Sequence, residues 1–255
     1  MTSRWIEADW PAPPNVIALT TTRAGGYSAG PYDSFNLAAH VGDAQQAVSA
    51  NRESLARQLS LPGPVQWLSQ VHGAEVVRAG RDERCPVADA SWSREPGVVC
   101  AVLTADCLPV LFCSRAGDAV AAAHAGWRGL LAGVLDNTVA AMGVAPGQLL
   151  AWLGPAIGPG AFEVGAEVRS AYLAGAKDPA GTAACFVSNS GRPRHFFADL
   201  YSLARLRLQA VGVAAVYGGD FCTYSDASRF YSYRRDGETG RMASIILLDA
   251  GQSRA

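Results

Sequence analysis

The stretch that decides the fold is residues 103–130, LTADCLPVLFCSRAGDAVAAAHAGWRGL. Two apolar runs, VLFCS and AVAAA, flank the turn-prone segment RAGD, and this pattern predicts a β-hairpin. Opposed residues of an antiparallel hairpin share one face. With a four-residue loop, Cys113 pairs with Asp118, and Cys107 lies directly opposite His124. The sequence therefore predicts a thiol and an imidazole side by side, whereas a slip of one residue would separate them onto opposite faces.

The composition is that of a globular protein. The chain has 255 residues, of which 49% are hydrophobic and 17% are charged. A formal net charge of −1 gives no reason to expect nucleic acid or an anionic membrane as a partner. No secretory signal and no apolar run of membrane-spanning length is found, so we expect a cytoplasmic protein. The six cysteines include no Cys-x-x-Cys pair, which argues against a zinc ribbon or a thioredoxin-type motif.

Outward from the hairpin, strands and helices are mixed. We expect strands at 16–23, 65–79 (broken at Gly73), 149–153, 195–198 and 213–219, and two final strands within 230–248. We expect helices from a cap at Asp43 to about Arg57, at 129–143, at 162–174 and after a cap at Asp199. Adjacent hairpins favour an α+β fold, and no composition break divides the chain. The prediction is one domain over residues 1–255, with mixed and antiparallel sheets flanked by helices in a layered αββα sandwich.

The same hairpin suggests a metal site. Zinc takes thiolate and imidazole ligands in tetrahedral geometry, and a catalytic zinc keeps one position open for water. Cys107 and His124 supply two ligands, and His72, at a strand break beside a glycine, is the best placed third. Three such ligands would lower the pKa of a bound water towards neutrality. The alternative is that both histidines are structural and Cys107 is a core residue. Asp106 could orient a ligand or shuttle a proton, although strand alternation points it to the other face.

Several motifs, in order along the chain, resemble one bacterial family. They are QVHG (70–73), TADCLP (104–109) and HAGWRG (124–129), supported by segments near residues 20–43, 154–165 and 222–244. The chain resembles the laccase-domain family, also called polyphenol oxidase or peptidoglycan editing factor and more recently described as multifunctional purine nucleoside phosphorylase. Asp89-Ala90 is followed here by Ser91-Trp92, where an apolar residue is more usual, so the role of that segment is open.

The resemblance implies an enzyme with a defined ligand set. It carries the family's metal ligands over to His72, Cys107 and His124, with zinc as the ion. It implies phosphorolysis of adenosine, inosine and S-methyl-5′-thioadenosine, and hydrolytic deamination of adenosine. The substrates would therefore be purine nucleosides and phosphate, and the sequence leaves the oligomeric state open. The His-x-Glu and Pro-Cys-x-x-Cys motifs of the known zinc deaminases are absent, so deamination would use another scaffold.

Substrate contacts can be predicted only in outline. The chain has no Gly-rich loop ending in Lys-Ser/Thr, so arginine side chains would hold a phosphate. The candidates are Arg23, beside the Gly-rich loop, Arg52 and Arg128; the alternative for each is surface ion pairing or, for Arg128, stacking on a tryptophan. Phe162 and Glu163 follow a Gly/Pro loop and are expected to line the pocket.

Three further functions remain open on these residues. A His₂Cys set suits copper, so a copper-binding, laccase-like polyphenol oxidase at the same ligands is one of them. A multicopper laccase, however, needs a second, histidine-rich cluster, and four histidines without a His-x-His pair cannot provide it. A metal-free cysteine hydrolase would use Cys107 as nucleophile and His124 as base, with no obligatory use for His72. A non-enzymatic editing module would bind cell-wall precursors in the same pocket.

Overall fold

The computed structural model describes residues 3–81, 84–249 and 251. Within them, three sheets form, with strand orders β1-β2-β14-β6-β3, β13-β9-β7-β8-β5-β4 and β10-β12-β11. The strands are β1 (Trp5–Glu7), β2 (Val16–Thr21), β3 (Val65–Gln66), β4 (Val76–Arg78), β5 (Ala90–Ser93), β6 (Val99–Thr104), β7 (Leu108–Ser114), β8 (Val120–Ala125), β9 (Leu149–Leu153), β10 (Glu163–Gly165), β11 (Phe186–Ser188), β12 (His195–Ala198), β13 (Ala215–Gly218) and β14 (Met242–Leu248). The helices are α1 (Gln45–Gln58), α2 (Trp127–Ala132), α3 (Val134–Met142), α4 (Ala166–Ala174), α5 (Pro179–Ala184), α6 (Leu200–Ala210) and α7 (Tyr233–Asp236).

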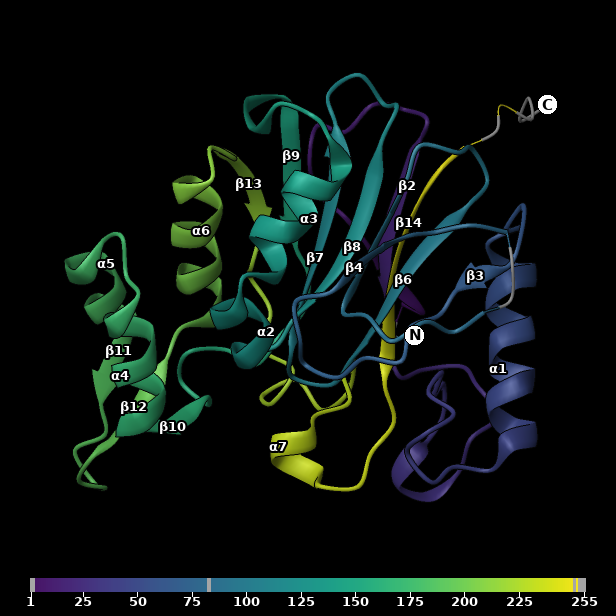
Figure 1. Cartoon of the computed structure of the whole chain (residues 1–255). Coiled ribbons are helices and arrows are strands. Elements are labelled where there is room, and N and C mark those ends of the chain that lie inside the picture. The colour runs from purple at the N-terminus through teal and green to yellow at the C-terminus, as the bar shows by residue number, and fades with distance from the viewer. Residues whose placement is uncertain (1–2, 82–83, 250, 252–255) are drawn as a thin grey trace.

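The two large sheets lie face to face between helices (Figure 1). Between the sheets, residues such as Leu111 of β7 and Ile246 of β14 form one core. A second core packs the other face of the six-stranded sheet against α3 and α6, and a third packs the five-stranded sheet against α1. Both the α+β class and the αββα layering are thereby confirmed. No helix in the described part of the chain is long and apolar enough to cross a membrane.

Central strands are buried on both faces, which explains their continuous apolar runs. In β7, Val110 and Phe112 face the helix-covered core while Leu111 and Cys113 face the neighbouring sheet. Burial raises the pKa of the Cys113 thiol to about 12, so this cysteine is a neutral, unreactive core residue at physiological pH.

The predicted β7–β8 hairpin is present, but its register differs from the prediction by two residues. Cys113 pairs with Val120 and not with Asp118, and His124 pairs with Pro109 and not with Cys107. The turn is longer than the four residues expected because the Ser114 hydroxyl accepts hydrogen bonds from the turn's backbone amides, those of residues 118 and 119. A shift of two residues preserves the face, since side chains alternate with a period of two.

Two predicted helices are interrupted. The segment 129–143 forms α2 and α3, separated by Gly133, whose φ of +96° ends one helix and begins the next. Left-handed backbone of this kind favours glycine. In the segment 162–174, strand β10 occupies the first residues by pairing with β12, and α4 begins only at Ala166.

Two other local predictions were wrong. Asp43 does not cap α1: the N-cap is Ala44, and the Asp43 carboxylate instead accepts hydrogen bonds from Ser28 and Asn36. The segment 230–248 contains one strand, β14, preceded by the short helix α7. The strand β2 and the Asp199 cap of α6, whose carboxylate accepts from the Ser202 amide, are as predicted.

Candidate metal centre

His72, Cys107 and His124 come together at one end of the central sheets. His72 lies in the loop between β3 and β4, Cys107 between β6 and β7, and His124 in β8. Their ligand atoms lie within 4.8 Å of one another. The Cys107 Sγ is 3.8 Å from the His72 Nε2, and the two imidazole rings meet edge to face with centroids 4.8 Å apart. The three predicted ligands therefore converge on one point.

The donor set fits a tetrahedral metal. Zinc bonds of about 2.3 Å to sulfur and about 2.0–2.1 Å to nitrogen place S and N ligand atoms about 3.6 Å apart in a tetrahedron. The 3.8 Å between Cys107 and His72 agrees with that spacing. One thiolate and two imidazoles leave a fourth position for a substrate or a water. The geometry supports a metal at these residues without identifying the ion.

Asp89, immediately before β5, orients two of the three ligands. Its buried carboxylate lies 2.8 Å from the Nδ1 of His124, so that the Nε2 of that ring is available as a ligand. The same carboxylate accepts hydrogen bonds from the amides of Val71, His72 and Gly73 at 3.2, 2.9 and 2.7 Å. These bonds hold His72 in a left-handed conformation, with a φ of +61°. A carboxylate behind a ligating histidine is common at metal sites.

Electrostatics favour the metal-binding form of the thiol. Burial alone raises the pKa of Cys107, but the charge and hydrogen bonds of His124 and His72 outweigh it and lower that pKa to about 6. Burial lowers the pKa of His124, but the Cys107 thiolate and Asp89 raise it to about 9. At neutral pH the metal-free pair is therefore a thiolate and an imidazolium.

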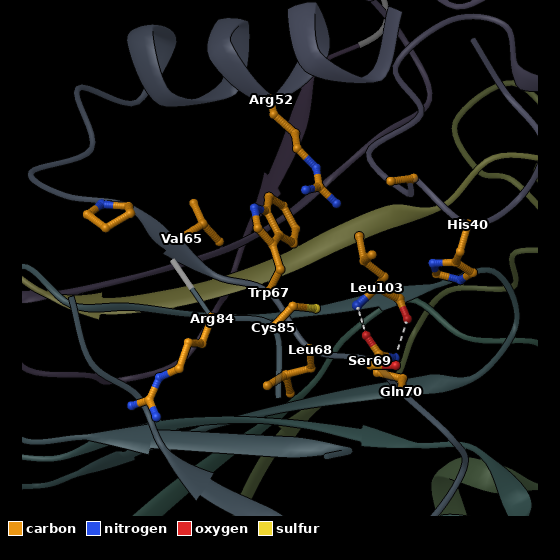
Figure 2. Close-up of a pocket in the computed structure, with 12 residues that line it drawn as sticks. His40, Arg52, Val65, Trp67, Leu68, Ser69, Gln70, Arg84, Cys85 and Leu103 are labelled. Atoms are coloured by element: carbon orange, nitrogen blue, oxygen red, sulfur yellow. Dashed lines mark hydrogen bonds between the residues drawn. The ribbon is translucent and has the colours of Figure 1, made fainter. Parts of the chain in front are cut away.

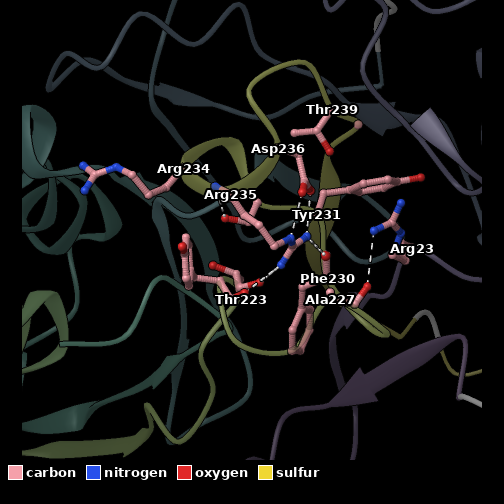
Figure 3. A network of polar contacts seen from close by, with 12 residues as sticks. Arg23, Thr223, Ala227, Phe230, Tyr231, Arg234, Arg235, Asp236 and Thr239 are labelled. Atoms are coloured by element: carbon pink, nitrogen blue, oxygen red, sulfur yellow. Dashed lines mark hydrogen bonds and ion pairs between the residues drawn. The ribbon is translucent and has the colours of Figure 1, made fainter. Parts of the chain in front are cut away.

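Asp106, next to the cysteine ligand, fastens the loops around the site. It has a φ of +88°, and its carboxylate accepts hydrogen bonds from the Thr223 hydroxyl and the Arg234 amide, both at 2.6 Å. Arg235 braces the same loop by donating to the carbonyl oxygens of Thr223 and Phe230 (Figure 3). Both carboxylate oxygens of Asp106 are thus engaged in holding these loops together, and the residue also lines the cavity of the metal centre.

The three ligands line a cavity of about 440 Å³. Among the residues predicted to bind substrate, Arg128 and Phe162 line it as well. Arg52 lines an adjoining cavity of about 750 Å³ (Figure 2). Glu163 lines a neighbouring hollow together with Arg234.

Arg23 lies elsewhere. Its guanidinium donates to the carbonyl oxygens of Asp33 and Ala227 and lies 4.8 Å from the Tyr231 ring centroid (Figure 3). These contacts join the Gly-rich loop to the C-terminal loop. Arg23 does not line the cavity that contains the metal ligands.

Sequence reasoning missed several residues of the site. The sequence draws attention to the segment of Asp89 only through the unusual Ser91-Trp92 that follows, whereas in the structure this segment carries the orienting carboxylate. His40, Tyr233, Arg234 and Arg241 line the cavity but were not singled out. All four lie in segments that resemble the family, His40 in 20–43 and the others in 222–244, so that resemblance is the available signal.

Comparison with known proteins gives close relatives along almost the whole chain. Purine nucleoside phosphorylase PA4543 of Pseudomonas aeruginosa is 57% identical over 244 residues, covering 96% of this chain and 98% of that protein. Purine nucleoside phosphorylase YfiH of Escherichia coli K12 is 53% identical over 247 residues, covering 96% and 99%. The crystal structure of Neisseria meningitidis protein NMB0706 matches with a TM-score of 0.92 at 53% identity, covering 97% of this chain and 100% of that one.

A more distant structure has the same fold. YlmD from Geobacillus stearothermophilus matches with a TM-score of 0.89 at 31% identity, covering 98% of this chain and 97% of that one. The family described as multi-copper polyphenol oxidoreductase laccase matches residues 17–249, a range that includes the whole ligand set. Sequence motifs, fold and relatives thus agree, and the chain belongs to this laccase-like family.

Proposed function

We propose that the protein is a zinc-dependent purine nucleoside phosphorylase that also deaminates adenosine. The observation that carries the proposal is the His72–Cys107–His124 triad in a cavity of a chain whose relative at 57% identity is named purine nucleoside phosphorylase. The substrates would be adenosine, inosine and S-methyl-5′-thioadenosine together with phosphate. The proposal places the enzyme in the cytoplasm, as a single domain, with small molecules rather than nucleic acids as partners.

The cavity suits a nucleoside. Small-molecule sites enclose about 300–1,000 Å³ and combine apolar walls with a few polar groups, and this cavity of about 440 Å³ is within that range. Phe162, Trp127 and Tyr233 offer aromatic surface for a purine ring. The guanidinium carbon of Arg234 lies 5.5 Å from the Phe162 ring centroid, and the Arg234 Nη1 donates to the Glu163 carbonyl. These contacts orient the Arg234 guanidinium beside the aromatic wall of the cavity.

The ligand set gives each protein residue a role. A divalent ion bound by the three ligands would supply Lewis acidity to a substrate or water at the open position. Asp89 keeps the Nε2 of His124 directed at the site and holds the loop of His72 in place. In phosphorolysis the bond between C1′ and the purine nitrogen breaks while a phosphate oxygen bonds to C1′. The protein's task is to place both reactants and to stabilise the separating charge.

The test combines metal analysis with activity. We expect the purified protein to contain about one zinc per chain, to release base from adenosine only when phosphate is present, and to form inosine slowly without it. His72→Ala should lose most of the zinc and the activity, whereas His195→Ala, which removes a histidine outside this cavity, should keep both. Full zinc and full turnover in His72→Ala would contradict the three-ligand site.

One observation also favours the cysteine-hydrolase alternative. Asp89, His124 and Cys107 are arranged as an acid, a base and a low-pKa thiol, which is the order of a nucleophilic triad. That mechanism would survive chelation of metal and the His72→Ala substitution. Phosphorolysis through a metal would survive neither. Copper in place of zinc at the same ligands is tested by reconstituting the metal-free protein with each ion in turn.

A further inference from the structure

The cavity of the metal centre continues into a second, larger one. The first encloses about 440 Å³ and the second about 750 Å³. Both are lined by His40, Gln70 and Leu103, so these residues mark the junction between them. The Gln70 side chain is bonded at both ends to the backbone of Leu103, at 2.8 Å in each direction, which makes this part of the wall rigid. A nucleoside at the metal does not require the additional space.

Two guanidinium charges and an imidazole gather at this junction. His40 lies there, with Arg52 in the wall of the larger cavity and Arg241 in the wall of the smaller one. Burial lowers the pKa of His40, and the charges of Arg241 and Arg52 lower it further, which places the imidazole within electrostatic reach of both. Within the described part of the chain, no ion pair joins any of the three to an Asp or a Glu.

Arg52 is held with its guanidinium available. Its Nε donates to the Leu37 carbonyl at 2.9 Å, and the guanidinium carbon lies 4.2 Å from the Trp67 ring centroid. Figure 2 shows the side chain coming from α1 beside the Trp67 ring, with His40 across the same space. The bond to Leu37 and the stacked ring orient the plane, so the two terminal nitrogens are presented as a fork, the geometry that suits a bidentate contact with phosphate.

The other arginines of the site are less suited to this task. Arg128 is exposed and stacks on Trp127 at 4.3 Å. Arg234 is also exposed. By contrast, Arg52 and Arg241 are partly buried, and burial lowers the pKa of each. Two partly buried guanidinium charges that face one cavity junction are costly unless an anion joins them.

We propose that His40, Arg52 and Arg241 form a phosphate-binding subsite at the junction of the two cavities. It would hold the phosphate group of either inorganic phosphate or a purine nucleotide. The role of inorganic phosphate here as the co-substrate rests on the proposed function, whereas binding as such does not. Arg241 lines the metal cavity and lies close enough to Cys107 for that thiolate to act on its pKa, so the subsite borders the metal centre.

Calorimetric titration of the zinc-loaded protein tests the subsite directly. The probes are inorganic phosphate and, separately, adenosine 5′-monophosphate. Arg52→Gln and His40→Gln should weaken binding about tenfold or more, because each removes a charged or polar contact to the anion. Arg57→Gln, on the same helix but with its side chain outside both cavities, makes the same charge change as Arg52→Gln and should bind as the wild type does.

Kinetics separate this proposal from the proposed function. If both hold, Arg52→Gln and His40→Gln raise the KM for phosphate while the KM for the nucleoside and the zinc content stay unchanged. If the wild type binds phosphate in this way but releases no base, the phosphorylase proposal fails and the subsite stands. A response to the nucleotide alone supports the subsite with a phosphate ester as its ligand.

Equal binding by Arg52→Gln, His40→Gln and Arg57→Gln overturns the subsite. Since His40 makes no hydrogen bond within the described part of the chain, its variant decides the matter if Arg52→Gln does not fold.

Discussion

At the scale of single residues, the site depends on how one buried carboxylate directs its neighbours. Asp89 accepts four hydrogen bonds, three from a backbone loop and one from a ligand imidazole. Nothing in the local sequence pattern marks this residue, because it lies far from His72 and from His124 along the chain. The ligands themselves could be predicted, since thiol and imidazole are distinctive metal donors and the chain has few histidines.

Replacing the Asp89 carboxylate by an amide should weaken the metal centre. Asp89→Asn preserves the side-chain shape but loses the negative charge and one acceptor oxygen. We expect zinc affinity to fall about 10–100-fold, the range usual for the outer partners of ligating histidines. Competition with a chelating dye measures this affinity. Glu53→Gln, an exposed change of the same kind on α1, should leave the affinity unchanged; an equal loss in both variants would contradict the role assigned to Asp89.

The Cys107 thiol should titrate well below an ordinary cysteine. Its pKa of about 6 means that the metal-free protein gains thiolate absorbance at 240 nm as the pH rises through that value. The difference spectrum against Cys107→Ser isolates this thiol from the other cysteines. Because protons compete with metal for the His124 imidazole and for the Cys107 thiolate, zinc affinity should fall as the pH is lowered below about 9 and more steeply below about 6. A midpoint near the ordinary value of about 8.5 would refute the assigned thiolate–imidazolium pair.

At the scale of elements, the hairpin shows what a pattern of residues can predict. Alternation along the hairpin predicts Cys107 and His124 on one face. In the structure Cys107 lies just before β7 and outside the paired residues, and its Sγ nevertheless meets the His124 imidazole at the metal centre. The register was wrong by two residues because the Ser114 side chain enlarges the turn, and hydropathy does not report such a contact. Similarly, the helical spacing over 129–143 continues across Gly133, although its left-handed backbone divides the helix. The β10 segment is predicted as helix from its local sequence. It forms a strand because it pairs with β12, a long-range contact that the local sequence does not report.

The break at Gly133 makes a prediction about stability. With a φ of +96°, an added Cβ would meet the Arg207 Nη2 at 3.0 Å. We expect Gly133→Ala to lower the free energy of unfolding by about 1–2 kcal/mol, the cost of left-handed backbone for a residue with a side chain. Denaturant titration measures the change. Gly147→Ala, where an added Cβ meets nothing within 4 Å and φ is ordinary, should be close to neutral; equal effects at both positions would show that backbone strain is not the cause.

At the scale of the whole molecule, the αββα layers fix the ends of three separate segments around one point. Class and layering could be predicted from alternating strands and amphipathic helices, because each layer requires an apolar face. The cavities could not, since loops far apart in the chain build them.

Metal binding should couple to global stability, because one ion joins three segments that are far apart in the chain. Zinc at about 100 times its Kd should stabilise the fold by about 2.7 kcal/mol, seen as a raised Tm. This gain should vanish in His72→Ala. A wild-type Tm that does not change when zinc is added would contradict the coupling.

The central claim is that His72, Cys107 and His124 together hold one catalytic metal. X-ray absorption at the zinc edge of the reconstituted protein tests it most directly. The account predicts one sulfur neighbour at about 2.3 Å and two imidazole nitrogens at about 2.0–2.1 Å, with one further light atom completing the tetrahedron. The sulfur shell should disappear in Cys107→Ser. A shell with no sulfur in the wild type, or a sulfur shell that persists in Cys107→Ser, would contradict the account.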